Sequence, residues 1–144
     1  MAAVKGVNAT IYTAGGESQI AAGYTDARVK AYYDTYVPLG TEAAGSTINV
    51  GPVLPAGAKI LGVTISNLTQ DAAVTLSVGD SNDPDRYITA YAADSVLYSD
   101  NLRQIGMGYV IGTNSGDTQV QILTAGATLG INDSISIVIL VATD

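Results

Sequence analysis

The sequence contains no cysteine, histidine, tryptophan or phenylalanine. Without cysteine there can be no disulfide bond, so burial of apolar side chains must stabilise the fold alone. Histidine and cysteine are also the side chains that most often transfer protons or attack substrates at neutral pH. A paired-carboxylate glycosidase is the one enzyme class left open, but the only glutamates, Glu17 and Glu42, lie outside the strongly patterned segments. We therefore expect no catalytic residue and no enzymatic activity.

Charged side chains are also scarce, at 13% of the 144 residues, and they sum to a net charge of −7. Globular proteins average about 25% charged residues. A surface this poor in charge is either covered by partner subunits or built from Thr, Ser, Asn and Gly. The Lys and Arg residues number six and are spread along the chain, so they form no basic patch for nucleic acid. Anionic membrane surfaces are disfavoured for the same reason.

Long hydrophobic runs are missing as well. The longest, residues 137–142, is far shorter than the roughly 18 residues that a membrane-spanning helix needs. The first residues do not have the apolar segment of a signal peptide. We therefore expect a single domain that is made in a cytoplasm.

What the sequence does contain is alternation of apolar and polar residues with a period of two, which is typical of half-buried strands. It predicts strands at 61–66, 74–78, 119–122 and 135–141, with weaker candidates at 47–50, 86–91 and 107–112. Turn sequences such as Leu-Pro-Ala-Gly at 54–57 separate them. The pattern predicts an all-β fold, an antiparallel β-sandwich of jelly-roll or immunoglobulin-like type. The expected core is Leu61, Val63, Ile65, Val74, Leu76, Val78, Ile122, Ile135, Ile137 and Ile139.

The N-terminal quarter has a different character. We interpret residues 1–23, rich in Ala, Gly and Thr with one strand candidate at 8–13, as an N-terminal arm preceding a β-sandwich domain at 24–144. Residues 24–37 fit two patterns, because Val29, Tyr32, Tyr33 and Tyr36 share a helix face while Val29, Ala31 and Tyr33 alternate as in a strand. The strand preference of Tyr, Val and Thr favours the strand. Residues 39–46 are expected to form a flexible loop.

One loop is rich in oxygen-bearing side chains and is the only candidate for a metal site. Asp80, Asn82, Asp83 and Asp85 could together bind Ca²⁺. Their spacing is not that of an EF-hand, and Asp and Asn also cap turns with their own side chains. Arg86 could in addition pair with Asp83 or Asp85. We favour a turn and expect no bound metal or cofactor.

The last predicted strand is apolar on both faces over its second half. Ile135, Ile137, Ile139 and Val141 fill one face, while Val138 and Leu140 occupy the other. A sandwich strand needs only one apolar face, so the second face predicts a patch that the arm or a neighbouring subunit covers. The tyrosines, which must supply all aromatic packing, are expected in the core or at an interface rather than in a stacking platform. The predicted interface residues are Val138, Leu140, Tyr32, Tyr33 and Tyr36.

Three stretches carry a family resemblance: Ala-Gly-Ser-Thr-Ile-Asn-Val-Gly at 44–51, Leu-Pro-Ala-Gly-Ala-Lys-Ile-Leu-Gly at 54–62, and Leu-Ser-Val-Gly-Asp-Ser-Asn-Asp-Pro-Asp-Arg-Tyr at 76–87. In this order the sequence resembles small virion structural proteins of tailed bacteriophages, among them capsid decoration (cement) proteins. The resemblance implies a non-enzymatic protein, made in the host cytoplasm, that binds and stabilises the capsid exterior. Its partner would be the major capsid protein or another virion protein, and a homo-oligomer, with a trimer favoured, is implied.

A second interpretation comes from another functional class. A receptor- or carbohydrate-binding module of a phage tail or fibre could use the tyrosines and the Asp80–Asp85 loop. A bacterial surface or filament subunit is a third possibility, and the missing signal peptide counts against it.

Overall fold

The computed structural model describes residues 28–71, 73–94, 97–99, 106–112 and 116–143. The predicted N-terminal arm at 1–23 and its strand candidate at 8–13 lie outside these residues. The described part contains eight strands, and none of it forms a helix long and apolar enough to cross a membrane.

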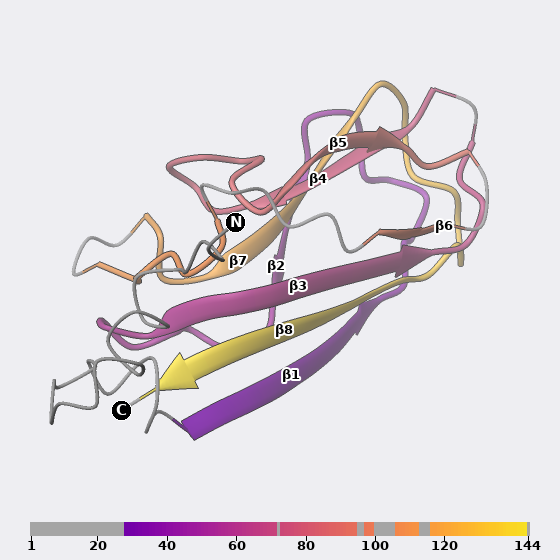
Figure 1. The fold of residues 1–144 in the computed structure, drawn as a ribbon. Coiled ribbons are helices and arrows are strands. Elements are labelled where there is room, and N and C mark those ends of the chain that lie inside the picture. Colours follow the sequence, from indigo (N-terminus) through magenta and orange to yellow (C-terminus); the bar gives the residue numbers. More distant parts are fainter. Residues whose placement is uncertain (1–27, 72, 95–96, 100–105, 113–115, 144) are drawn as a thin grey trace, which may run out of the picture.

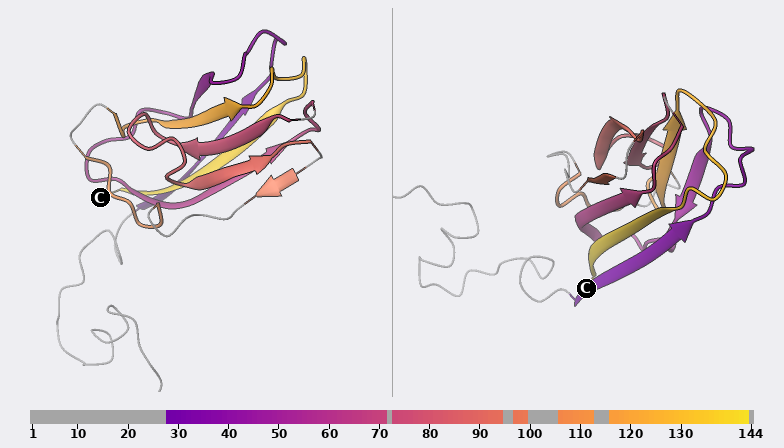
Figure 2. Two further views of the ribbon diagram at one scale, coloured as in Figure 1. Left: turned by 90° about the horizontal axis from the view of Figure 1, so that it is seen from above. Right: turned by 90° about the vertical axis from the view of Figure 1, so that its right-hand side faces the viewer.

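The strands form two four-stranded antiparallel sheets (Figure 1). They are β1 (Arg28–Tyr36), β2 (Thr47–Val50), β3 (Lys59–Asn67), β4 (Thr75–Gly79), β5 (Ile88–Ala92), β6 (Leu97–Ser99), β7 (Val120–Ala125) and β8 (Ile135–Thr143). The orders are β1-β8-β3-β6 and β2-β7-β4-β5. Among the described strands, β4 and β5 are the only two that follow each other in the chain and lie in the same sheet. Every other connection between consecutive strands crosses from one sheet to the other (Figure 2). The predicted all-β sandwich is confirmed, and eight strands in this order make it a jelly roll rather than an immunoglobulin-like domain.

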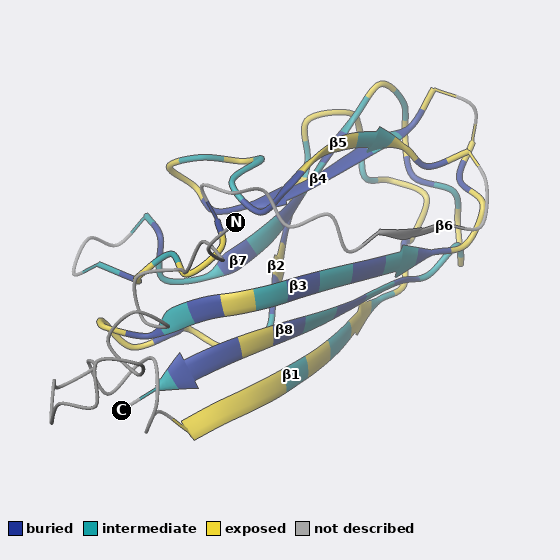
Figure 3. Cartoon of the chain, in the orientation of Figure 1, coloured by how far each residue is buried: buried dark blue, intermediate teal, exposed yellow. Residues whose placement is uncertain are grey.

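The core lies between the two sheets, and the strand sequences explain it. Buried side chains alternate along β3, β7 and β8, as Figure 3 shows for β3 and β8. All the predicted core residues except Leu61 are buried. Loop residues that no periodicity identified complete the core, namely Leu54, Tyr87, Ile111 and Leu129.

The prediction for Leu61 was wrong because β3 contains a bulge. Ile60 lies opposite Val141, and Gly62 lies opposite the adjacent residue Leu140, so the register shifts between them. A bulge inserts one extra residue into a strand and breaks the alternation of its faces. Ile60 therefore takes the buried position, whereas Leu61 is 40% exposed.

Two weaker predictions also have definite outcomes. The strand favoured within 24–37 is confirmed as β1 from Arg28. The strand expected at 107–112 is wrong, because in this segment only Val110 forms a bridge, opposite Lys59. Gly108 has a positive φ of 72°, which turns the backbone out of the extended conformation that a strand requires.

The bulge provides a matched pair of substitutions. Val63→Asp places an unpaired charge in the core, which costs several kcal/mol against a typical domain stability of about 5–15 kcal/mol. We expect this variant to yield no soluble folded protein. Leu61→Asp, two residues away in the same strand, should fold with a melting temperature close to that of the parent. Circular dichroism and soluble yield measure both, and equal damage by the two substitutions would contradict the bulge.

Candidate interaction surfaces

The outward side of the β1-β8-β3 sheet carries an apolar patch. We call it the outer sheet face and define it by Val29, Ala31, Tyr33, Leu61, Val138 and Leu140. Ala31 and Gly62 flank Leu140 on the neighbouring strands, and Tyr33 lies opposite Val138. A Cβ added to Gly62 would lie 3.4 Å from Leu140 Cδ1, so this leucine leans across the glycine. Leu140 is 38% exposed and Tyr33 is 71% exposed, so the described part of the chain leaves this patch available to a partner.

Hydroxyl groups border this face towards the end of β1. Thr35 Oγ1 donates to Tyr33 Oη at 2.8 Å and lies 3.0 Å from Ser136 Oγ. Tyr33 Oη is also 3.3 Å from Ser136 Oγ. Hydrogen bonds from Ser136 and then Thr35 lower the pKa of Tyr33. The outer sheet face therefore changes from apolar to hydroxyl-lined along the strands.

The structure separates the three tyrosines that the sequence grouped as interface residues. Tyr33 lies on the outer sheet face together with Val138 and Leu140, as a strand requires. Tyr32 and Tyr36 lie opposite Ile139 and Ile135 and pack against the core. The shared helix face considered for these residues does not exist, because β1 alternates its side chains between two sides.

Tyr87, Tyr91 and Tyr109 do not form a stacking platform. Tyr87 is fully buried. Tyr91 Oη donates to Asn67 Oδ1 at 2.8 Å, and Tyr109 Oη donates to Asp117 Oδ2 at 2.8 Å. Burial and hydrogen bonding therefore commit these rings to the interior or to loop packing.

The loop that follows β4 is a turn organised by Asp80. Its Oδ1 accepts hydrogen bonds from the backbone N–H groups of Asn82 at 2.9 Å and Asp83 at 3.0 Å. Its Oδ2 accepts from Arg86 Nε at 2.5 Å. Arg86, expected to pair with Asp83 or Asp85, thus binds chiefly to Asp80, with Asp83 Oδ2 at 4.0 Å from its Nη1. Within the described residues, no group of three Asp, Glu, His or Cys side chains is arranged to hold a metal ion.

The loop packs tightly against the end of β4 and against a neighbouring segment. A Cβ on Gly79 would lie 2.1 Å from the Asp83 carbonyl oxygen, so only glycine fits there. On the other side, Arg86 Cζ lies 4.1 Å from the centre of the Tyr109 ring, which is within range for a cation–π interaction. Hydrogen bonds from the Gly112 N–H and then Tyr109 help to lower the pKa of Asp117, which anchors this segment. The acidic and aromatic side chains here join two loops.

The loop at 37–42 forms a second candidate interaction surface, which the sequence analysis did not identify. Glu42 accepts hydrogen bonds from the backbone N–H groups of Leu39, Gly40 and Thr41 at 3.0, 3.0 and 3.1 Å. Tyr36 Oη also donates to this carboxylate. Within the loop expected at 39–46, these hydrogen bonds form a turn around Glu42. The one available signal was a glutamate in a chain that has only two.

This turn presents aliphatic side chains to solvent. Leu39 is 70% exposed and Ile131, on the β7–β8 connection, is 65% exposed. The Asn132 N–H donates to the Pro38 carbonyl at 3.0 Å, which joins the two loops. We call Val37, Leu39 and Ile131 the aliphatic tip. Hydrogen bonds to Glu42 and between the two loops hold this backbone, which lowers the ordering cost that the tip would incur on binding a partner.

The stability of this turn should depend on pH. The hydrogen bond from Tyr36, followed by those from the backbone, lowers the pKa of Glu42 from 4.5 to about 2. A lowered folded-state pKa adds stability above the ordinary pKa, and that stability disappears as the pH falls towards the lowered value. We expect Glu42→Gln to reduce the melting temperature near neutral pH, with a difference that shrinks on acidification through this window. Asp71→Asn, on an exposed loop, is the control, and a pH-independent difference for Glu42→Gln would contradict the assignment.

Calcium provides a separate test of the Asp80 turn. Since Arg86 and two backbone N–H groups already occupy the Asp80 carboxylate, we expect neither calcium nor chelator to change the melting temperature. A ligand that binds the folded state raises that temperature with concentration. A saturable rise with calcium, abolished by Asp80→Asn, would show that the loop is a metal site.

Comparison with protein-family models and with curated protein sequences finds no match. Solved structures do match. A chain in the capsid asymmetric unit of cyanophage Pam1 superposes with a TM-score of 0.57 at 25% identity, covering 82% of this chain and 86% of that one. A chain in the capsid of Ralstonia phage GP4 superposes with a TM-score of 0.62 at 18% identity, covering 81% of this chain and 85% of that one. The resemblance to bacteriophage structural proteins that the three sequence stretches indicated is thereby confirmed.

Proposed function

We propose that this chain is a non-enzymatic structural protein of a bacteriophage virion that binds the capsid exterior and stabilises it, as a decoration protein does. The observation that carries the proposal is the similarity to a chain of the cyanophage Pam1 capsid at 25% identity over 82% of this chain. The major capsid protein is the partner we propose first, because a decoration protein acts by bridging its subunits.

The arrangement of acidic side chains supports a role without turnover. Asp80 holds Arg86 and its own turn, Glu42 holds the aliphatic tip, and Asp117 holds the Tyr109 segment. Each of these three carboxylates thus stabilises a loop. Stabilisation of a capsid would come from buried interface area instead.

The outer sheet face is the surface that we propose contacts the capsid. Fully burying one Leu, Val or Ile side chain stabilises a complex by about 1.5–3 kcal/mol, and several such residues lie together here. The surrounding hydroxyl groups of Tyr33, Thr35 and Ser136 can fix the orientation through hydrogen bonds. A modest gain at each subunit, repeated over a capsid, would resist internal pressure.

Binding to empty capsids tests this function. We expect purified protein to bind saturably and stoichiometrically to capsids of the phage that encodes it, and to raise their temperature of disruption. Leu140→Glu, in the middle of the outer sheet face, should weaken binding about tenfold or more because it buries a charge at the contact. Val53→Glu is the matched control, since Val53 is exposed but lies on the β2–β3 connection.

The same assay separates this proposal from a carbohydrate-binding module of a tail or fibre. Saturable binding to a defined glycan, together with no binding to capsids, would replace the decoration role by the carbohydrate one.

A further inference from the structure

The free edge of β1 differs from the other sheet edges of the described molecule. The edge strands β2 and β6 have four and three residues, and β5 pairs with β4 through an irregular register. Short strands and bulges are ways in which proteins prevent unwanted strand pairing. By contrast β1 has nine residues, contains no proline and pairs with β8 without interruption.

The hydrogen-bonding pattern shows which backbone groups of β1 point outward. The Leu68 N–H donates to the Ser134 carbonyl at 3.1 Å, in the register that joins β3 to β8. Even-numbered residues of β8 therefore bond to β3, and odd-numbered residues bond to β1. The residues of β1 that lie opposite the odd-numbered residues of β8 are even-numbered, and these bond to β8. The odd-numbered residues of β1, Val29, Ala31, Tyr33 and Thr35, therefore direct their N–H and C=O groups away from the sheet.

Among the described residues, side chains cover only the far half of this edge. The Thr35 N–H donates to Oδ1 of the adjacent residue Asp34 at 2.8 Å. The N–H of Gly51, just after β2, donates to Asp34 Oδ2 at 2.9 Å. Among the described residues, no other strand lies beyond β1. The described residues therefore leave the segment from Val29 to Tyr33 open at this edge.

We propose that this segment pairs with the same segment of a second copy, antiparallel and about a two-fold axis at Ala31. The axis places Val29 opposite Tyr33, and each of Val29, Ala31 and Tyr33 then donates and accepts one backbone hydrogen bond. An isologous two-fold contact uses the same patch on both copies, and pairing of sheet edges is an established mode of protein association. The inference goes beyond the proposed capsid binding and is tested without capsids.

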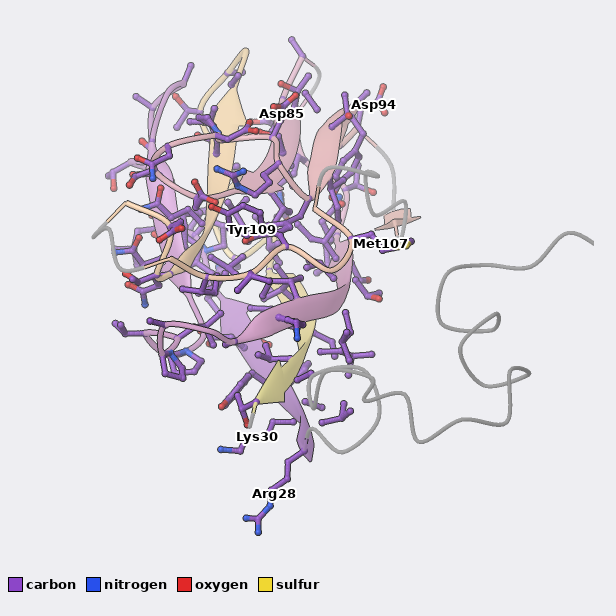
Figure 4. The ribbon with its side chains drawn as sticks, turned by 60° about the vertical axis from the view of Figure 1, so that its left-hand side comes forward. Arg28, Lys30, Asp85, Asp94, Met107 and Tyr109 are labelled. Carbon is purple, nitrogen blue, oxygen red and sulfur yellow. The ribbon has the colours of Figure 1, made fainter. Side chains whose placement is uncertain are left out.

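Charge identifies the occupant as a second copy. A two-fold axis at Ala31 brings Arg28 of each copy opposite Asp34 of the other, which makes two cross-strand pairs of opposite charge. Figure 4 shows Arg28 and Lys30 extending from the end of β1, on the opposite side of the view from Asp85 and Asp94. Opposite charges placed directly across neighbouring strands stabilise pairing, and like charges destabilise it. For a chain of net charge −7, an interface that neutralises its own carboxylates avoids the repulsion between copies.

The two outer sheet faces would then join into one surface. Val29 of one copy would lie beside Tyr33 of the other, so the apolar patch would continue across the axis. A capsid partner would meet this surface twice per dimer, which raises its apparent affinity through a high effective concentration.

The oligomeric state of the intact chain is the first test, by light scattering with size-exclusion chromatography. We expect a dimer at micromolar concentrations. A monomer at high micromolar concentration, or a trimer, would overturn the pairing.

Substitution of the edge backbone is the second test. Ala31→Pro removes an outward N–H that β8 does not use, and proline is tolerated on edge strands in that orientation. We expect it to raise the dimer dissociation constant about tenfold or more. The melting temperature of each variant is measured to show that the protein is folded. Ala31→Ser keeps the N–H and should leave the constant unchanged. A folded Ala31→Pro protein that dimerises like the parent would refute the proposal.

Charge exchange tests the register independently. Arg28→Glu and Asp34→Arg should each weaken their own dimers, because each places like charges opposite one another. Mixed together, they should form a heterodimer in which both pairs are again opposite in charge. A mixture that associates no better than the separate variants would exclude the axis at Ala31, whereas Leu140→Glu should leave the dimer intact even though it weakens capsid binding.

Discussion

Strand β8 holds one sheet together, since it pairs along its length with both β1 and β3. Its inward side chains Ile135, Ile137, Ile139 and Val141 are essentially fully buried. Backbone groups and core side chains of three strands thus depend on this one segment. Its outward residues Val138 and Leu140 sit at the middle of the outer sheet face for the same reason, because a central strand presents both of its faces. The inward face of β8 therefore stabilises the core, and its outward face forms part of the proposed capsid contact.

Regular strands could be predicted from the sequence, and irregular positions could not. Periodicity of two identified β3, β4, β7 and β8 because apolar and polar side chains alternate along each of them, and it identified most of the core. Leu61 was misplaced because a bulge depends on how β3 registers with β8, which no local pattern records. Tyr87, Ile111 and Leu129 were missed because loops enter the core without any periodicity. The jelly-roll order itself depends on pairings between residues far apart in the chain.

The polar residues show a similar division. Val138, Leu140 and Tyr33 could be predicted as surface apolar residues, although only alternation along β1 separates Tyr33 from Tyr32 and Tyr36. The oxygen-rich loop looked like a cation site in sequence, yet the Asp80 carboxylate binds Arg86 and two backbone N–H groups. Glu42 likewise serves its own turn. Carboxylates that bind neighbouring N–H groups cannot be distinguished in sequence from those that bind ligands, since both need Asp or Glu in a loop.

The pairing of β1 with β8 also governs when the chain can fold during synthesis. Tyr33 and Ser136, whose hydroxyl groups hydrogen-bond across this pair of strands, are 103 positions apart. Until Ile135–Thr143 leaves the ribosome, β1 and β3 lack the strand that lies between them, and their apolar sides face solvent or a chaperone. Closure of so long a loop is slow compared with local helix or hairpin formation. The nascent chain can therefore complete this sheet only after β8 has been synthesised, and until then β1 lacks the strand with which it pairs.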